Sequence, residues 1–330
     1  MTELTIPQIT SNLPKSANKK EAKTKFKIIS LFSGCGGMDL GFTGGFNFLG
    51  KHFDALPFEV IWANDLNAAA CRSYAKNLKH PIHQGSIWDH IKGIPKSADV
   101  VIGGFPCQDI SVNGKGAGVA GARSGLYRAM VEVVSNTKPK IFIAENVKGL
   151  LMKNNKDSLK QIIDDFTSLG YNLSYKLYHA VEYGVPQTRE RVIIVGTKPG
   201  IKKFEHPEPI YPSEMWITAE QAIADLETLP ANTEFSHIWS LAKKSPEQGS
   251  RMLKADRAGY TVRAECHGNI HFHYKLDRRM SMREAARIQS FPDDFIFDAK
   301  LRETERQIGN AVPPVLAWHI AKATMLCLQS

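Results

Sequence analysis

The sequence predicts an α/β fold built on a doubly wound sheet, with helices on both faces and a smaller inserted domain. Between residues 26 and 198, apolar strand-like runs alternate with segments of helical period, a pattern typical of this fold class. Several chemistry-bearing residues directly follow those runs, at the strand ends where such sheets bind ligands. After Lys198 the regular pattern stops and returns only at Ser281, which predicts the insertion.

Three segments follow from this pattern. Residues 1–24 mix Ser, Thr, Asn, Pro and Lys with little hydrophobic period, which predicts a basic, flexible arm. That arm either keeps the protein soluble or contacts nucleic acid. We place the main, catalytic domain at residues 25–198 together with 301–330. Residues 199–300 are the predicted inserted domain, which ends with a hinge helix near Ser281.

Composition bounds the class of protein and its partners. The formal net charge of the 330 residues is +9, which favours a polyanionic partner. The five cysteines are odd in number and contain no C-x-x-C pair, which argues against a disulfide framework and for a reducing compartment. Neither an apolar core of signal-peptide length nor a run of 18 apolar residues occurs. We therefore expect a soluble cytoplasmic protein.

The first strand is expected at Phe26 to Phe32 and runs into a glycine-rich turn at Ser33 to Gly37. Such a turn between a strand and a helix lets backbone amides approach a nucleotide-like ligand closely. The spacing is G-x-G-G, which differs from the spacing in dinucleotide-binding proteins. A plain tight turn is the alternative interpretation.

The second strand, Phe58 to Ala63, ends at Asp65. An acidic residue in this position can hydrogen-bond ribose hydroxyls, and it can also cap the helix predicted at Ala68 to Leu78. A further strand end at Gly85 to Ile87 is a candidate wall for the base of a nucleoside.

The fourth strand begins at Val100 and ends in Gly103-Gly104, after which a proline presents Cys107. A cysteine at such a turn is either a nucleophile or a small buried residue. A fifth strand, Lys140 to Ala144, ends at Glu145. Because strand ends meet at one edge of the sheet, the glycine turn, Asp65, Cys107 and Glu145 should share one cleft.

The remaining elements complete the main domain. Helices are expected at Leu126 to Ser135, Ser158 to Leu169 and Val315 to Leu328. The last two strands are expected at Tyr171 to Leu177 and Arg191 to Gly196. In the inserted segment, helical period is found at Ala219 to Leu226 and at Ser281 to Gln289.

Six short sequence blocks stand out along this pattern. They are Phe32-Ser33-Gly34-Cys35-Gly36-Gly37, Gly104-Phe105-Pro106-Cys107-Gln108, Glu145-Asn146-Val147, Gln187-x-Arg189-x-Arg191, Arg283-Glu284-x-Ala286-Arg287-x-Gln289-x-Phe291-Pro292 and Gln307-Ile308-Gly309-Asn310. In type, order and spacing they resemble the cytosine-C5 DNA methyltransferases of bacterial restriction-modification systems. The resemblance leaves out only the basic arm and the segment near residues 200–260.

This resemblance implies a Rossmann-like methyltransferase sheet, an inserted target-recognition domain, and S-adenosylmethionine as methyl donor, with S-adenosylhomocysteine as product. The residues that it assigns to the donor are Phe32, Ser33, Gly34, Cys35, Gly36, Gly37, Asp65, Leu66, Ser86, Ile87, Pro106, Leu126, Asn310 and Ala311. The chain departs from the family pattern at Asp65, Leu66 and Ser86, where glutamate, an aromatic residue and aspartate are usual.

The resemblance also implies the catalytic residues. Carbon 5 of cytosine is a weak nucleophile, and addition of the Cys107 thiolate at carbon 6 makes the ring enamine-like. Glu145 is expected to contact ring N3 and the exocyclic amine, where it neutralises developing charge. Arg191 is expected to hold the O2 carbonyl, and Arg189 to order the loop or contact a phosphate.

Duplex DNA is the expected partner, and the target cytosine must be flipped out of the stack. The candidate DNA contacts are Gln108, Ser111, Lys115, Arg123, Gln187, Arg263, His267 and Asn269. For Lys115 and Arg123, solvated loop charge is the alternative. We expect no metal site, because the Cys266, His267, His271 and His273 cluster lacks a second cysteine pair.

Three rival functions are considered. An RNA methyltransferase would share most of these blocks, although the inserted segment of this chain favours DNA. A catalytically dead DNA-binding relative is expected to lack Cys107 or Glu145, and both are present. A nicotinamide-dependent oxidoreductase fails on the glycine spacing. We expect a monomer that is linked functionally to a restriction endonuclease, with an orphan methyltransferase as the alternative.

Overall fold

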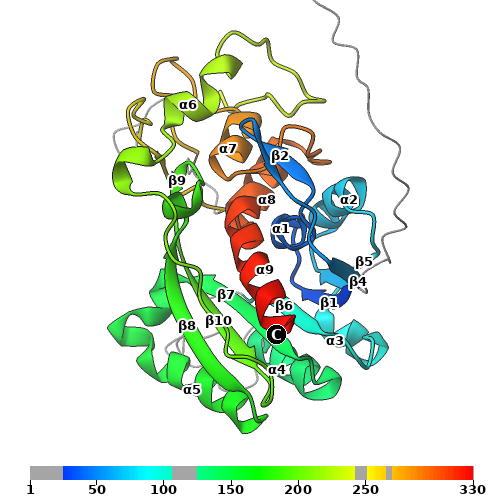
Figure 1. Cartoon of the computed structure of the whole chain (residues 1–330). Helices are drawn as coiled ribbons and strands as arrows, with labels where there is room; N and C mark the ends of the chain where they lie inside the picture. The colour runs from blue at the N-terminus through cyan, green and yellow to red at the C-terminus, as the bar shows by residue number, and fades with distance from the viewer. Residues whose placement is uncertain (1–24, 106–124, 242–250, 265–269, 330) are drawn as a thin grey trace, which may run out of the picture.

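A seven-stranded sheet forms the centre of the protein (Figure 1), with strand order β5-β4-β1-β6-β7-β10-β8. The structure is a computed structural model and describes residues 25–105, 125–241, 251–264 and 270–329. The strands of this sheet are β1 (Phe26–Leu31), β4 (Phe58–Asp65), β5 (Ile82–Gln84), β6 (Val100–Gly104), β7 (Ile141–Val147), β8 (Asn172–His179) and β10 (Glu190–Thr197).

Helices pack on both faces of this sheet, as Figure 1 shows. The α-helices of the described residues are α1 (Gly37–Thr43), α2 (Ala68–Asn77), α3 (Ile87–His90), α4 (Leu126–Thr137), α5 (Lys156–Ser168), α6 (Ala219–Ile223), α7 (Met282–Ile288), α8 (Leu301–Asn310) and α9 (Pro314–Leu328), of which α6 and α7 lie away from the sheet. Short 3-10 helices lie at Ile91–Gly93, Lys148–Leu151, Lys153–Asn155, Ala180–Tyr183, Ser213–Met215 and Ala224–Leu226. The expected α/β fold with a doubly wound sheet is therefore confirmed.

The sheet is mixed rather than wholly parallel. Strands β5, β4, β1, β6 and β7 run parallel to their neighbours, whereas β10 is antiparallel to both β7 and β8. The connection between β8 and β10 is short, and a short connection joins antiparallel strands because a parallel pair needs a long crossover. The parallel strands therefore end at one edge of the sheet.

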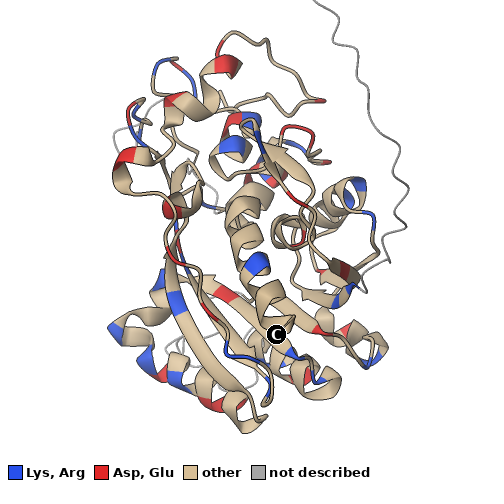
Figure 2. Ribbon diagram, viewed as in Figure 1, with Lys and Arg blue, Asp and Glu red and all other residues tan. Residues whose placement is uncertain are grey.

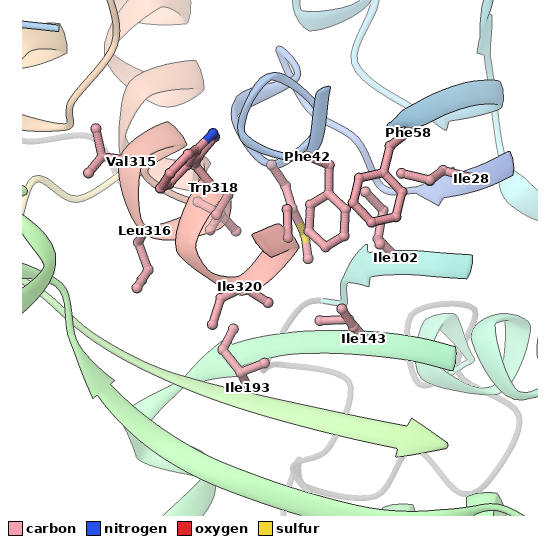
Figure 3. Close-up of a cluster of buried hydrophobic side chains, with 14 of the residues drawn as sticks. Ile28, Phe42, Phe58, Ile102, Ile143, Ile193, Val315, Leu316, Trp318 and Ile320 are labelled. Carbon is pink, nitrogen blue, oxygen red and sulfur yellow. The ribbon is translucent and has the colours of Figure 1, made fainter. Parts of the chain in front are cut away.

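Alternating side chains of the central strands divide between two apolar layers. Ile28 and Ile143 belong to the layer between the sheet and helices α1 and α9, which is drawn in Figure 3. Ile29 and Phe142, each one residue away, belong to the opposite layer against α4 and α5. Burial on both faces explains why these strands appear as continuous apolar runs in the sequence.

A third apolar cluster lies outside the sheet. It joins residues of α6 and α7 to Val262, Ile270 and three phenylalanines, and it also takes in Cys35 and Ile308. We call the described residues of 199–300 the insert region, and those of 25–198 and 301–329 the sheet region. In the insert region β11 (Gly259–Tyr260) pairs with β9 (Gln187–Thr188), so a two-residue ladder connects the regions.

Two parts of the fold are additional to those expected from the sequence. Strands β2 (Phe46–Phe48) and β3 (Lys51–Phe53) form a small hairpin. The segment containing Gln307 to Asn310 forms the end of helix α8. Residues 301–328 have the length and composition of a membrane span. However, 67% of the 18-residue apolar window within them is buried inside the fold. Such burial is that of a core helix.

Candidate active site

A cavity of about 630 Å³ lies at the carboxyl ends of β1, β4, β6 and β7. Its walls come from the glycine turn, from strand ends, from β10 and from the end of α8. The lining residues are Ser30, Leu31, Phe32, Ser33, Gly34, Gly37, Met38, Asp39, Asp65, Asn67, Ala70, Gly103, Gly104, Phe105, Glu145, Asn146, Val147, Arg189, Arg191, Ala264, Arg306, Gln307, Gly309, Asn310, Ala311 and Val312. The expected common cleft exists for the described residues.

The glycine turn is shaped by close backbone approach. Gly36 has φ +94°, and a Cβ there would lie 2.3 Å from a Leu78 side-chain carbon. A Cβ on Gly37 would lie 2.5 Å from the Val312 carbonyl oxygen. Only glycine fits these two positions, so the turn brings α1 close to the chain between α8 and α9.

Asp65 fixes the turn from the end of β4. Its Oδ2 accepts the Gly34 N–H at 2.8 Å, and its Oδ1 accepts the Asn67 N–H at 2.8 Å. Burial raises the pKa of Asp65, although both backbone hydrogen bonds oppose the shift. The helix that follows is capped by Asn67, whose side chain accepts the Ala70 N–H, and not by Asp65.

Glu145 and Arg191 form an ion pair on the cavity wall, with 2.6 Å between Oε1 and Nε. Glu145 is 8% exposed. It lies beside Gly104 in the parallel register of β6 and β7, and a Cβ on Gly104 would lie 3.0 Å from Glu145 Oε2. Burial lowers the pKa of Arg191, and Glu145 opposes that shift. Gly104 therefore leaves space for this carboxylate.

Asn146, a residue that the sequence did not single out, anchors the end of β6. Its side-chain amide donates to the Phe105 carbonyl oxygen at 3.0 Å and accepts the Val147 N–H. Phe105 is the last described residue before the predicted nucleophile. The predicted site residues Pro106, Cys107, Gln108, Ser111, Lys115, Arg123, His267 and Asn269 lie outside the described residues.

Arg189 connects the regions instead of facing a phosphate. Its guanidinium donates to the Val262, Gly309 and Ala311 carbonyl oxygens at 2.9, 2.8 and 3.2 Å. The side chain is 1% exposed, and burial lowers its pKa well below the usual value. Of the two expected roles, this geometry corresponds to ordering the loop.

Gln187, which we expect to contact DNA, is buried in this structure. Its side chain has no exposed surface, donates to the Ile288 carbonyl and to Gln289, and accepts the Val262 N–H at 2.9 Å. Both polar groups of the amide are thus engaged inside the protein. Arg263, by contrast, is exposed and adjoins Ala264 on the cavity wall.

The structure divides the predicted donor residues into two groups. Seven line the cavity: Phe32, Ser33, Gly34, Gly37, Asp65, Asn310 and Ala311. Six described residues lie outside its lining: Cys35, Gly36, Leu66, Ser86, Ile87 and Leu126.

Each of these six has another environment. Cys35 is buried, with its thiol toward the Gln307 carbonyl, and Gly36 packs on α2. Ser86 caps α3, whereas Ile87 and Leu126 pack in the apolar layer beneath α4. Leu66 is 73% exposed.

Two buried polar side chains on the cavity wall were missed by sequence reasoning. Gln307 is 4% exposed, and neither its Oε1 nor its Nε2 has a hydrogen-bond partner among the described residues. Asp39 has no exposed surface, and its Oδ2 is also unpartnered. Asp39 could have been identified from the sequence, because it is a charged residue within a mostly apolar helical segment. For Gln307 the burial depends on α8, which the sequence pattern did not predict.

Comparison with known proteins gives consistent results. A model of the family described as C-5 cytosine-specific DNA methylase matches residues 26–258 and 231–325. A Type II methyltransferase of Neisseria gonorrhoeae, M.NgoFVII, is 37% identical, with 96% of this chain and 89% of that protein covered. M.FnuDI of Fusobacterium nucleatum, also a Type II methyltransferase, is 34% identical, with 90% and 93% covered.

Solved structures show the same fold. A putative DNA modification methyltransferase encoded within an E. coli prophage has a TM-score of 0.70 at 23% identity, covering 93% of this chain and 100% of that one. A DNMT2 variant of Spodoptera frugiperda has a TM-score of 0.64 at 16% identity, covering 91% and 99%. With the family match over most of its length, the chain belongs to the C-5 cytosine-specific DNA methylases.

Proposed function

We propose that this protein transfers a methyl group from S-adenosylmethionine to carbon 5 of a flipped-out cytosine in duplex DNA. The observation that carries the proposal is the Glu145–Arg191 pair, with 2.6 Å between Oε1 and Nε on the cavity wall. Ring atoms N3 and O2 of cytosine are neighbours, so one acidic and one basic group side by side match that edge of the base.

The cavity residues fit the methyl donor. The glycine turn provides a surface that a Cβ would fill, and the unpartnered amide of Gln307 provides a donor and an acceptor on the same wall. Asp65, Gly309 and Asn310 line this cavity, and we assign Asp65 to the ribose and Gly309-Asn310 to closing the pocket. When bound there, S-adenosylmethionine supplies a methyl group on a sulfonium.

Cys107, Glu145 and Arg191 activate the cytosine ring for methyl transfer. The Cys107 thiolate forms a bond to carbon 6, and the ring electrons move toward N3 and O2. Glu145 neutralises the charge at N3, while Arg191 holds O2. After carbon 5 has taken the methyl group, its proton leaves to water and the carbon–sulfur bond breaks, which releases the thiolate. Asn146 holds the Phe105 carbonyl, two residues before the nucleophile.

The insert region is proposed as the target-recognition domain, with residues 25–198 and 301–330 as the catalytic domain. Arg263 is exposed beside the cavity wall, where it can reach a base edge or a phosphate. Lysine and arginine residues occur in both regions (Figure 2). Salt-dependent phosphate contacts from both sides would offset the cost of flipping the base.

The cellular role is proposed from the relatives. Those reported above are named as Type II methyltransferases, so we propose that this chain is the modification component of a restriction-modification system. It would act as a monomer on DNA in the cytoplasm and share only a recognition sequence with its endonuclease.

The test compares duplex DNA with tRNA as acceptors of a labelled methyl group from S-adenosylmethionine. We expect label in duplex DNA, and bisulfite sequencing of that DNA should locate 5-methylcytosine within one short sequence. Label in tRNA alone would overturn the proposal. Label in DNA at adenine or at the cytosine amine would contradict the assigned chemistry.

A further inference from the structure

Asp39 is a buried carboxylate on the wall of the donor cavity that the proposed reaction does not use. It lies in the first turn of α1, has no exposed surface, and contributes to the lining together with Ser30 and Ser33. Its Oδ2 has no hydrogen-bond partner. An unsatisfied buried carboxylate oxygen is costly, so its retention here requires a reason.

One oxygen of this carboxylate is held in place from behind. Oδ1 accepts the Tyr74 hydroxyl at 2.8 Å, and the same hydroxyl contacts His80 Nδ1 at 2.8 Å. Because the tyrosine proton points to Asp39, His80 must donate to the tyrosine oxygen through Nδ1–H. Burial lowers the pKa of His80 to about 4, so the histidine is neutral. The chain from His80 to Asp39 therefore fixes the carboxylate without neutralising its charge.

Two acidic side chains, Asp39 and Asp65, lie beside the glycine turn on the cavity wall. Asp65 is bonded to backbone N–H groups. Within the described parts of the chain, no lysine, arginine or histidine forms a salt bridge with either aspartate. Of the three arginines that line the cavity, Arg191 pairs with Glu145, Arg306 pairs with Glu303, and Arg189 donates to backbone carbonyl oxygens. A cationic ligand would be attracted to the two aspartates.

We propose that Asp39 is a positioning residue for the positively charged amino-acid end of the methyl donor, whose ammonium it attracts at the wall that Ser30 and Ser33 also line. The inference rests on the proposed function, because that function supplies the donor. The two serine hydroxyls lie 2.8 Å apart, and both serines line the cavity beside Asp39. Asp39 would thereby distinguish ligands that carry the amino-acid group from nucleosides that lack it.

The protonation behaviour of this cluster supports the proposal. Burial raises the pKa of Asp39 to about 6, and the Tyr74 hydrogen bond and the nearby Ser30 hydroxyl oppose the shift. The other titratable groups facing it are Tyr74, His80, Asp65 and Cys35. Burial raises the pKa of Tyr74 and of Cys35. Donor affinity should then fall as pH drops through about 6, since the protonated carboxyl loses its attraction for a cation.

The experiment measures dissociation constants by calorimetry for S-adenosylmethionine, S-adenosylhomocysteine and 5′-methylthioadenosine, the last of which lacks the amino-acid group. Asp39→Asn should weaken binding of the first two ligands by about 10- to 100-fold and leave the third within about 2-fold. The matched control is Asp157→Asn, which removes the charge of an exposed acid in the first turn of α5. It should change none of the three constants.

A second variant tests the same residue through pH. Tyr74→Phe removes the hydrogen bond that lowers the pKa of Asp39, so the midpoint for S-adenosylmethionine binding should move above about 6. In Asp39→Asn the midpoint should disappear, which separates Asp39 from Asp65. Equal weakening of all three ligands, or an unchanged midpoint in Tyr74→Phe, would overturn the proposal. If the unaltered protein binds none of the ligands, the proposed function itself fails.

Discussion

Different interactions stabilise the interior of the sheet region and the interior of the insert region. In the sheet region, side chains such as Ile143 and Ile194 are fully buried between backbone ladders and helices. In the insert region, buried arginines bind the chain: Arg283 donates to the Phe235, Pro292 and Phe295 carbonyls at 2.9, 3.0 and 2.8 Å. Arg287 pairs with Asp293 at 2.7 Å.

This contrast shows what each region requires of its sequence. Apolar layers tolerate exchange of one aliphatic residue for another at modest cost, and a ladder needs no particular side chain. A carbonyl held by a guanidinium has no substitute partner when that side chain is lost. The insert region therefore depends on individual polar residues more than the sheet region does.

The largest effect should come from the sheet region's own chemistry. Glu145→Gln keeps the shape of the side chain and removes its charge, so kcat should fall by about 10²- to 10⁴-fold. Affinity for duplex DNA should change little. Because the change leaves the buried Arg191 guanidinium without its carboxylate, circular dichroism first establishes that the variant is folded. Glu190→Gln, in the same sheet and paired with Lys148, is the control and should retain activity. Retained activity in Glu145→Gln would remove Glu145 from the mechanism.

Arg283→Ala tests the dependence of the insert region on single polar residues. It leaves three carbonyls without their partner, so we expect a loss of about 3 kcal/mol or more in urea unfolding. Ile193→Val, in the sheet core, should cost only about 1 kcal/mol. Equal losses in the two variants would contradict the contrast between the regions.

Lowering the pH should decrease the stability of the insert region by a smaller amount. Burial lowers the pKa of His271 to about 4, whereas the unfolded chain takes up that proton near pH 6.5. The stability that neutral His271 contributes is thus complete above pH 6.5 and is lost as pH falls toward 4. The expected loss is about 2 kcal/mol by pH 5. His271→Asn should show a flatter pH profile of the urea midpoint, whereas His52→Asn, an exposed histidine, should follow the unaltered protein.

The regular part of the fold was predictable because its signals are local. The strand expected to start at Phe26 and the helix expected to start at Leu126 both begin at those residues. Helix α8 was missed because Leu301 and Ile308 are the only large apolar side chains among its ten residues. The hairpin of β2 and β3 was missed because each strand has only three residues.

The candidate site was predictable only where residues follow strand ends. Asp65 and Glu145 reach the common cavity for that reason. The burial of Gln187 depends on Gln289, about a hundred positions away in the chain, and the partner of Asp39 is Tyr74. No local sequence pattern indicates such pairings, so the sequence predicted neither the burial of Gln187 nor the position of Asp39.

The most direct test of the proposed mechanism traps the bond between Cys107 and the base. A duplex with 5-fluorocytosine at the methylated position cannot lose a proton from carbon 5 after transfer, so the adduct should persist. Incubated with S-adenosylmethionine, the protein should form a denaturation-resistant complex whose modified peptide contains Cys107. Cys71→Ala should form the same complex and Cys107→Ala should form none. A complex that persists in Cys107→Ala, or no complex with a duplex whose unfluorinated form is methylated, would contradict the mechanism.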